Sequence, residues 1–232
     1  MSTKIRFEAP KTLGAIPLNK YQKYVDILDK NKDAKDDELI NLKVLEKFCG
    51  LTLKEAYNLK LTDFSVLINH INSLFNQNTP LIHRFDMIDS KGVKIEFGFI
   101  PKLDDISLGE FVDLDNYIGK WEHMHKAMAV LYRPVISEKR NMYLIEDYES
   151  SDKYSEVMKN MPLDVTLGAA VFFYRLGIRL SKHLMDSLGK EMKEGKTTHL
   201  KQTLEENGVG INQFMRSLEV MQQSLKRSQN FI

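Results

Sequence analysis

Apolar residues recur at intervals of three and four along the first third of the chain, which is the spacing of one face of an α-helix. This periodicity predicts amphipathic helices over 18–28, 39–48 and 64–75. Pro17 precedes the first stripe, where a proline is tolerated because the first helical turn has donors without intrahelical partners. Gly50 follows the second stripe and predicts its end.

Two pairs of residues have the spacing of a capping box, in which a Ser or Thr and a Glu three positions later bond to each other's backbone N–H. Thr52 and Glu55 form the first pair and predict a short helix over 53–59. Ser107 and Glu110 form the second pair and predict the start of another helix.

The pattern changes period in the middle of the chain, where two short apolar-rich runs, 82–88 and 93–99, flank the polar residues 89–92. Short runs around a turn that contains glycine predict a β-hairpin. The alternating residues 3–8 predict a further short strand, which we expect at an edge.

The remaining apolar stripes predict a series of helices in the second half of the chain. Their approximate ranges are 107–118, 121–132, 151–161, 164–188, 198–206 and 211–228. Pro134 is expected to end the second of these and to open a connector, because the residue before a proline disfavours helical geometry. The predicted fold is mainly α, a helical bundle-like fold with a small β-hairpin insertion at about 82–99 and an N-terminal edge strand. We expect a single α-rich domain over 1–232, with two lobes, 1–80 and 81–232, as the alternative.

The composition is ordinary for a soluble globular protein and disfavours several classes. The 232 residues include 33 Lys and Arg against 32 Asp and Glu, and a net charge of +1 disfavours a globally basic nucleic-acid binder. The single cysteine, Cys49, excludes an intramolecular disulfide and fits a reducing compartment. The first residues lack an apolar signal core and no run approaches about 18 apolar residues, so we expect neither secretion nor a membrane span.

Few residues form a pattern typical of catalysis or metal binding. Glu122, His123 and His125 are close in sequence, but side chains at i and i+2 of a helix point about 200° apart, and no second ligand cluster completes a site. Cys49 ends an apolar helix stripe, where the helix dipole disfavours a thiolate, so we interpret it as a core residue. The carboxylates over 104–115 lack the ligand spacing of a calcium loop. We therefore expect no enzyme activity, no metal and no cofactor.

Charge is distributed unevenly along this nearly neutral chain. Residues 100–118 carry five acids and one base, a net charge of −4, whereas residues 171–201 carry seven bases and three acids, a net charge of +4. The two segments could neutralise each other within one chain, or they could pair head to tail between copies in a heterologous interface that closes into a ring. Three consecutive aromatic residues in the basic segment cannot all face one core, so at least one ring is expected to meet another element or another subunit. The candidate interface residues are Asp104, Asp105, Glu110, Asp113, Asp115, Phe172, Phe173, Arg175, Arg179 and Lys182.

Two further features indicate close packing. Arg133, directly before Pro134, is expected to tie the chain to a carboxylate or to backbone carbonyls rather than to contact DNA. Gly168 and Gly177 each weaken an apolar helix by about 1 kcal/mol relative to alanine. A close helix–helix crossing would explain why glycine occupies these positions.

A further feature of the sequence is a set of short segments that are distributed over most of residues 16–215. They are IPLNKYQKYVDIL, FCGLTLKEAYNL, FGFIPKLDDISLGEFVDLDNYI, WEHMHKAMAVLYRPV, MPLDVTLGAAVFFYRLG and LEENGVGINQF. Together they resemble a family of tailed-bacteriophage structural and assembly proteins encoded among the tail and connector genes, with the crAss-like podoviruses that infect Bacteroides as a good fit. None of the strings is a catalytic signature.

The resemblance implies a non-enzymatic virion protein that forms an oligomeric ring of about twelve copies in the portal-to-tail region. Such a ring would contact neighbouring portal and tail proteins, would meet DNA only if one face lines the lumen, and would be synthesised in the cytoplasm of the host bacterium. A tail assembly chaperone, which binds the tape measure protein and is not kept in the virion, is the first alternative. A cytosolic adaptor or regulatory protein is the second.

Overall fold

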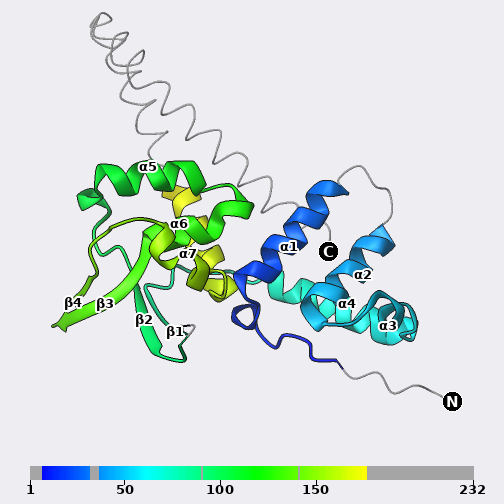
Figure 1. Cartoon of the computed structure of the whole chain (residues 1–232). Helices are drawn as coiled ribbons and strands as arrows, with labels where there is room; N and C mark the ends of the chain where they lie inside the picture. The colour runs from blue at the N-terminus through cyan, green and yellow to red at the C-terminus, as the bar shows by residue number, and fades with distance from the viewer. Residues whose placement is uncertain (1–6, 32–36, 90, 141, 177–232) are drawn as a thin grey trace, which may run out of the picture.

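The structure is a computed structural model that describes residues 7–31, 37–89, 91–140 and 142–176 (Figure 1). Its first four α-helices confirm the helices predicted for the first third of the chain and lie together on one side of the molecule. They are α1 (Leu18–Lys30), α2 (Asp37–Cys49), α3 (Leu53–Tyr57) and α4 (Leu61–Phe75), preceded by a 3-10 helix at Leu13–Ala15. The capping box predicted at Thr52 and Glu55 is present at the start of α3.

An aromatic cluster holds these helices together. Tyr21 and Tyr24 on α1 are fully buried. The centroid of the Tyr24 ring lies 5.2 Å from that of Phe48 on α2, and Phe75 of α4 lies 5.4 Å from Phe48. The Tyr21 ring lies 4.7 Å from Trp121, which comes from the other half of the chain. Tilted and edge-to-face pairs at these separations add about 0.5–1.5 kcal/mol each beyond the burial of apolar area.

The hairpin predicted at about 82–99 is confirmed, but it is one half of a larger sheet. Its strands β1 (Arg84–Ile88) and β2 (Lys94–Phe99) are followed by β3 (Tyr132–Lys139) and β4 (Met142–Ile145). All four strands pair antiparallel in the order β1-β2-β3-β4. The prediction of a mainly α fold with one small hairpin insertion is therefore wrong, because the described chain has a mixed α and β fold.

Of the two strands that the sequence did not predict, β3 passes through Pro134, the residue expected to open a connector. In the structure α6 ends at Leu131 and β3 follows directly. Pro134 pairs in register with Phe97 of β2, and its carbonyl oxygen accepts a hydrogen bond of 2.9 Å from the N–H of Glu146, just after β4. The nitrogen and the carbonyl of one residue in an antiparallel strand point to the same side, so the Pro134 nitrogen points away from β2. A proline is tolerated here because the β2–β3 ladder loses no hydrogen bond.

The remaining helices gather at one end of the sheet, away from the hairpin tips (Figure 1). They are α5 (Leu108–Tyr117), α6 (Met124–Leu131), α7 (Asp152–Met158) and the helical residues 163–176, with 3-10 helices at Leu103–Asp105 and Trp121–His123. The second predicted capping box, at Ser107 and Glu110, is confirmed at the start of α5.

A short segment after α7 connects the two groups of helices through the backbone. The N–H groups of Leu18 and Asn19, at the start of α1, donate to the carbonyl oxygens of Met161 (2.9 Å) and Lys159 (2.8 Å). Pro17 at the N-cap provides no side-chain hydrogen bond, so these distant carbonyls satisfy donors that every helix start leaves open. The buried apolar side chains of both groups form one contiguous core.

Several predicted elements lie outside the described residues. They are the helices at 198–206 and 211–228, the later part of the 164–188 helix, and residues 3–6 of the 3–8 strand. Phe7 and Glu8 are described and are not in a strand. Within the described ranges, no helix is long and apolar enough to cross a membrane.

Candidate functional site

A buried ion pair anchors the acidic segment to the sheet. The Ser107 hydroxyl accepts a hydrogen bond from the Glu110 N–H (3.2 Å), and the Ser107 N–H donates to Glu110 Oε2 (2.7 Å). The other carboxylate oxygen, Oε1, lies 2.6 Å from Nη1 of Arg133 on β3, and both side chains are less than one-tenth exposed. Burial opposes ionisation of Glu110, but the bonds from Ser107 and the positive charge of Arg133 outweigh it and hold the pKa of this carboxyl below its usual range. The predicted interaction of Arg133 with a carboxylate is confirmed. Because of this ion pair Glu110 is buried and is not a surface residue.

The other four acidic candidates have different surroundings. Asp113 accepts a hydrogen bond from the Tyr148 hydroxyl. Asp115 is half-buried, and its Oδ1 atom has no hydrogen-bond partner within the described part of the chain. Asp105 is exposed, and the side chain of Asp104 is not among those the structure describes. The acidic candidates therefore do not form one uniform surface, and Asp105 alone of the described ones is exposed.

The outer side of α5 carries apolar residues that we name the α5 ridge: Leu108, Phe111 and Val112. These side chains are 79%, 53% and 46% exposed, whereas Glu110 and Leu114 of the same helix are buried. Positions i, i+3 and i+4 share one face of a helix, so the three side chains are neighbours. Charge alone drew attention to this segment in the sequence, and the apolar i, i+3, i+4 spacing was the signal that would have found the ridge.

The helical residues 163–176 place two of the predicted aromatic residues against the sheet. The ring centroids of Phe172 and Phe173 lie 5.7 Å and 6.2 Å from that of Phe99 on β2. Phe173 is buried, whereas Phe172 is only half-buried. Arg175 is exposed and has no ion pair with any other described residue. The remaining basic candidates, Arg179 and Lys182, lie outside the described residues.

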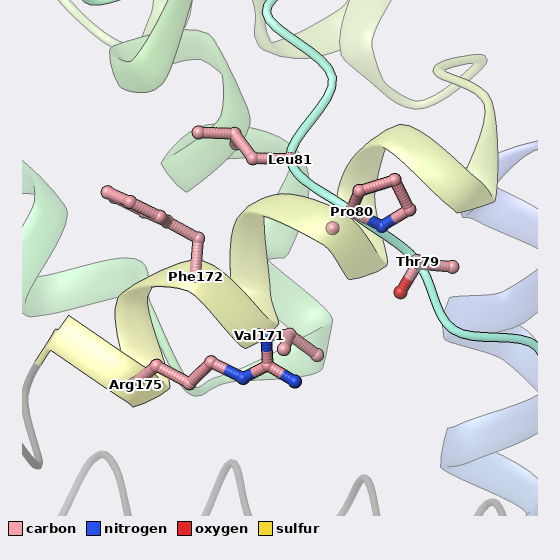
Figure 2. Close-up of a pocket in the computed structure, with 7 residues that line it drawn as sticks. Thr79, Pro80, Leu81, Val171, Phe172 and Arg175 are labelled. Atoms are coloured by element: carbon pink, nitrogen blue, oxygen red, sulfur yellow. The ribbon is translucent and has the colours of Figure 1, made fainter.

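A pocket of about 530 Å³ opens where the segment between α4 and β1 crosses this helix (Figure 2). It is lined by Thr79, Pro80, Leu81, Gly168, Val171, Phe172 and Arg175. A Cβ atom at Gly168 would lie 2.2 Å from the carbonyl oxygen of Pro80, so only glycine permits this close crossing. The close approach expected at Gly168 is therefore present, although its partner is an extended segment and not a second helix.

His123 and His125 have separate partners. The His123 ring packs edge-to-face with the Tyr117 ring, with 5.9 Å between the ring centroids. His125 Nδ1 lies 3.0 Å from Nε2 of Gln22 on α1. Burial is the main reason that the pKa of His125 lies below its usual value, with the charge of Lys159 adding to the effect. Across the described ranges, no group of three or more His, Cys, Asp and Glu side chains is arranged to hold a metal ion.

In comparisons with known proteins, no protein-family model, curated protein or solved structure matches the chain. Two of the surfaces that the described chain exposes lie in the segments of opposite charge: the α5 ridge in the acidic segment, and the pocket at the start of the basic segment. Both leave apolar side chains accessible to a partner.

Proposed function

We propose that this chain is a non-enzymatic virion structural protein that forms an oligomeric ring in the portal-to-tail region of a tailed bacteriophage. The resemblance of its sequence strings to tail and connector proteins supports the phage context. The α5 ridge is the structural observation that supports assembly into an oligomer. Large apolar side chains grouped on one face of an exposed helix mark a surface that another protein covers.

The use of charged side chains inside the subunit supports a structural role. Glu110 and Arg133 lock α5 onto β3, as described above. On the sheet, Arg84 of β1 binds both Glu96 of β2 (Nε to Oε1, 2.8 Å) and Glu138 of β3 (Nη2 to Oε2, 2.9 Å). These pairs join neighbouring elements and help every copy to keep one shape. A ring requires this, because identical contacts repeat around its axis.

A ring in this position would contain about twelve copies and would contact the neighbouring portal and tail proteins. It would need no cofactor, and DNA would touch it only at a face that lines the lumen. The chain would be made in the cytoplasm of the host and would be found in the mature virion.

Virions purified from the phage that encodes the chain provide the test. Quantitative mass spectrometry should find the chain at a fixed ratio of about a dozen copies per particle, and electron microscopy should place these copies in a ring between portal and tail. Absence of the chain from washed particles would contradict the proposal. Its recovery with the tape measure protein from infected cells, without incorporation into particles, would support the tail assembly chaperone instead.

A further inference from the structure

We infer that neighbouring copies interlock by inserting the α5 ridge of one copy into the pocket beside the helical residues 163–176 of the next. This inference rests on the proposed ring and names the surfaces that form its subunit contact. The ridge and the pocket share no residue, so the contact is heterologous. A heterologous contact repeats from copy to copy and closes into a ring when the rotation per subunit divides a full turn.

The ridge has the form of a helical anchor. Leu108, Phe111 and Val112 have the i, i+3, i+4 spacing with which amphipathic helices enter apolar grooves. On its buried side, α5 is held by Leu114 and by the ion pair between Glu110 and Arg133. The ridge is therefore presented on a fixed helix, and a pre-organised surface loses less conformational entropy on binding.

The pocket has the size and the chemistry to receive such side chains. Its volume of about 530 Å³ lies within the range of about 300–1,000 Å³ that is common for ligand pockets. Leu81, Val171 and Phe172 provide apolar walls, and Figure 2 shows Leu81 and Phe172 projecting to the same side of the crossing. We place Phe111 in this pocket, because it is the largest side chain of the ridge.

Charge complementarity identifies a second copy of this chain as the occupant. Arg175 at the edge of the pocket is exposed and has no ion-pair partner among the described side chains. The exposed carboxylate of Asp105 lies just before the ridge, where its ion-pair partner is the likewise exposed Lys102 at 3.6 Å. In the sequence, Asp105 belongs to a segment of net charge −4 and Arg175 to one of net charge +4. Inserting the ridge into the pocket brings Asp105 of one copy toward Arg175 of the next. Exposed pairs chiefly set register and encounter rate, while burial of the ridge supplies the affinity.

Directional cross-linking tests this contact in the full chain. Val112→Cys places a thiol on the ridge and Thr79→Cys places one at the pocket, while the native Cys49 is buried. After treatment with a short bis-maleimide, a mixture of the two variants should give covalent dimers, whereas each variant alone should give none. A chain with both substitutions should give a ladder of products that ends at the copy number of the ring. Cross-linking of Val112→Cys copies to each other, or no cross-link in the mixture, would overturn the inference.

Leu108→Ser tests the ridge against a matched control. Leu61 begins α4 as Leu108 begins α5, and each is 79% exposed. Loss of Leu108 should raise the concentration at which rings form by about tenfold or more, because its apolar surface is buried in the contact. Leu61→Ser should leave that concentration unchanged, and equal effects of the two substitutions would contradict the inference.

A charge exchange tests the register of the same contact. Asp105→Arg and Arg175→Asp should each weaken ring formation more at low salt than at high salt, because ions screen exposed charges. The two substitutions together should restore it. Lys54→Glu, which changes an exposed cation on α3, should have no effect. No restoration in the double variant would show that the two charges do not meet.

Failure of this inference is distinct from failure of the proposed function. If virions contain a ring of this chain but the cross-links and the ridge variants give the contrary results, the ring uses other surfaces. If virions lack the chain, the proposed function is wrong. A chain that stays monomeric and forms no cross-link, as it would if its own residues filled the pocket, contradicts the inference in either case.

Discussion

The Oε1 atom of Glu110 lies 2.6 Å from the Nη1 atom of Arg133, and both side chains are more than nine-tenths buried. The same glutamate closes the capping box at Ser107, so one side chain both starts α5 and docks it on β3. Because α5 carries the ridge, the proposed subunit contact depends on this pair.

Glu110→Gln is expected to lower the free energy of unfolding by about 3–5 kcal/mol, because it leaves the Arg133 charge buried without a partner. Combining it with Arg133→Met should recover most of the loss, since no unpaired charge is then buried. Glu55→Gln is the matched control, because Glu55 closes the equivalent box with Thr52 at an exposed site and should cost much less. Urea denaturation measures the free energy of unfolding of all three variants. Equal losses for the two single glutamate variants would show that the ion pair adds nothing.

The contribution of Glu110 should disappear in acid. Burial raises the pKa of the Glu110 carboxyl, but the hydrogen bonds with Ser107 and the charge of Arg133 lower it by more. The pKa in the folded state is therefore below the unfolded value of about 4.3. Its stabilisation is therefore complete above about pH 5 and is lost as the pH falls through the folded pKa. The difference in unfolding free energy between the wild type and Glu110→Gln should be constant from about pH 7 to 5 and should shrink below about pH 4. A difference that persists unchanged at about pH 3 would contradict this assignment.

Gly168→Ala should destabilise the fold by about 1–3 kcal/mol, although alanine favours a helix by about 1 kcal/mol. The added Cβ would lie 2.2 Å from the Pro80 carbonyl oxygen, and a backbone atom has little room to move. Gly109→Ala in α5 is the control, because its nearest neighbour would be Cε1 of Tyr148 at 3.9 Å. That variant should be neutral or slightly more stable. Thermal unfolding of both variants measures the contrast, and a stabilised Gly168→Ala would show that the crossing is not this close.

The Cys49 thiol should be unreactive while the chain is folded. It is buried at the end of α2, and burial raises its pKa to about 11, so little thiolate is present near neutral pH. DTNB should react with the native chain only slowly and with one thiol per chain in denaturant. Leu61→Cys provides a positive control, since the new thiol occupies an exposed position. Rapid reaction of the native wild-type chain would show that Cys49 is accessible.

The amino-terminal helices, the capping boxes and the first hairpin could be predicted because their decisive interactions are local. Thr52 and Glu55 are three residues apart and bond within one turn. In the hairpin, Asp89 Oδ1 accepts hydrogen bonds from the N–H groups of Lys91 and Val93, and Gly92 has a φ of +80°. Residue type and spacing are sufficient to indicate such features.

The candidate site could be predicted only in part. The sequence grouped the acids of 100–118 by charge, but the orientation of α5 buries Glu110 against Arg133 and leaves Asp105 in solvent. The sequence also indicated three adjacent aromatic residues as candidates for an interface, but one of them, Phe173, is buried inside the subunit. Which side of a helix is covered depends on its neighbours, and a single helix does not contain that information.

The amino-acid sequence was sufficient for the helical periods, the capping boxes and the opposite charges of two segments, since each depends on residues that are close along the chain. The tertiary structure decided that residues after α6 add two strands, with Pro134 tolerated because its nitrogen points away from β2. It also decided that Gly168 meets Pro80 and that a pocket opens beside their contact. Strand pairing, burial of charge and close crossings join residues that are distant in sequence. The free energy of such a contact depends on both of the surfaces that meet, so it cannot be deduced from either segment alone.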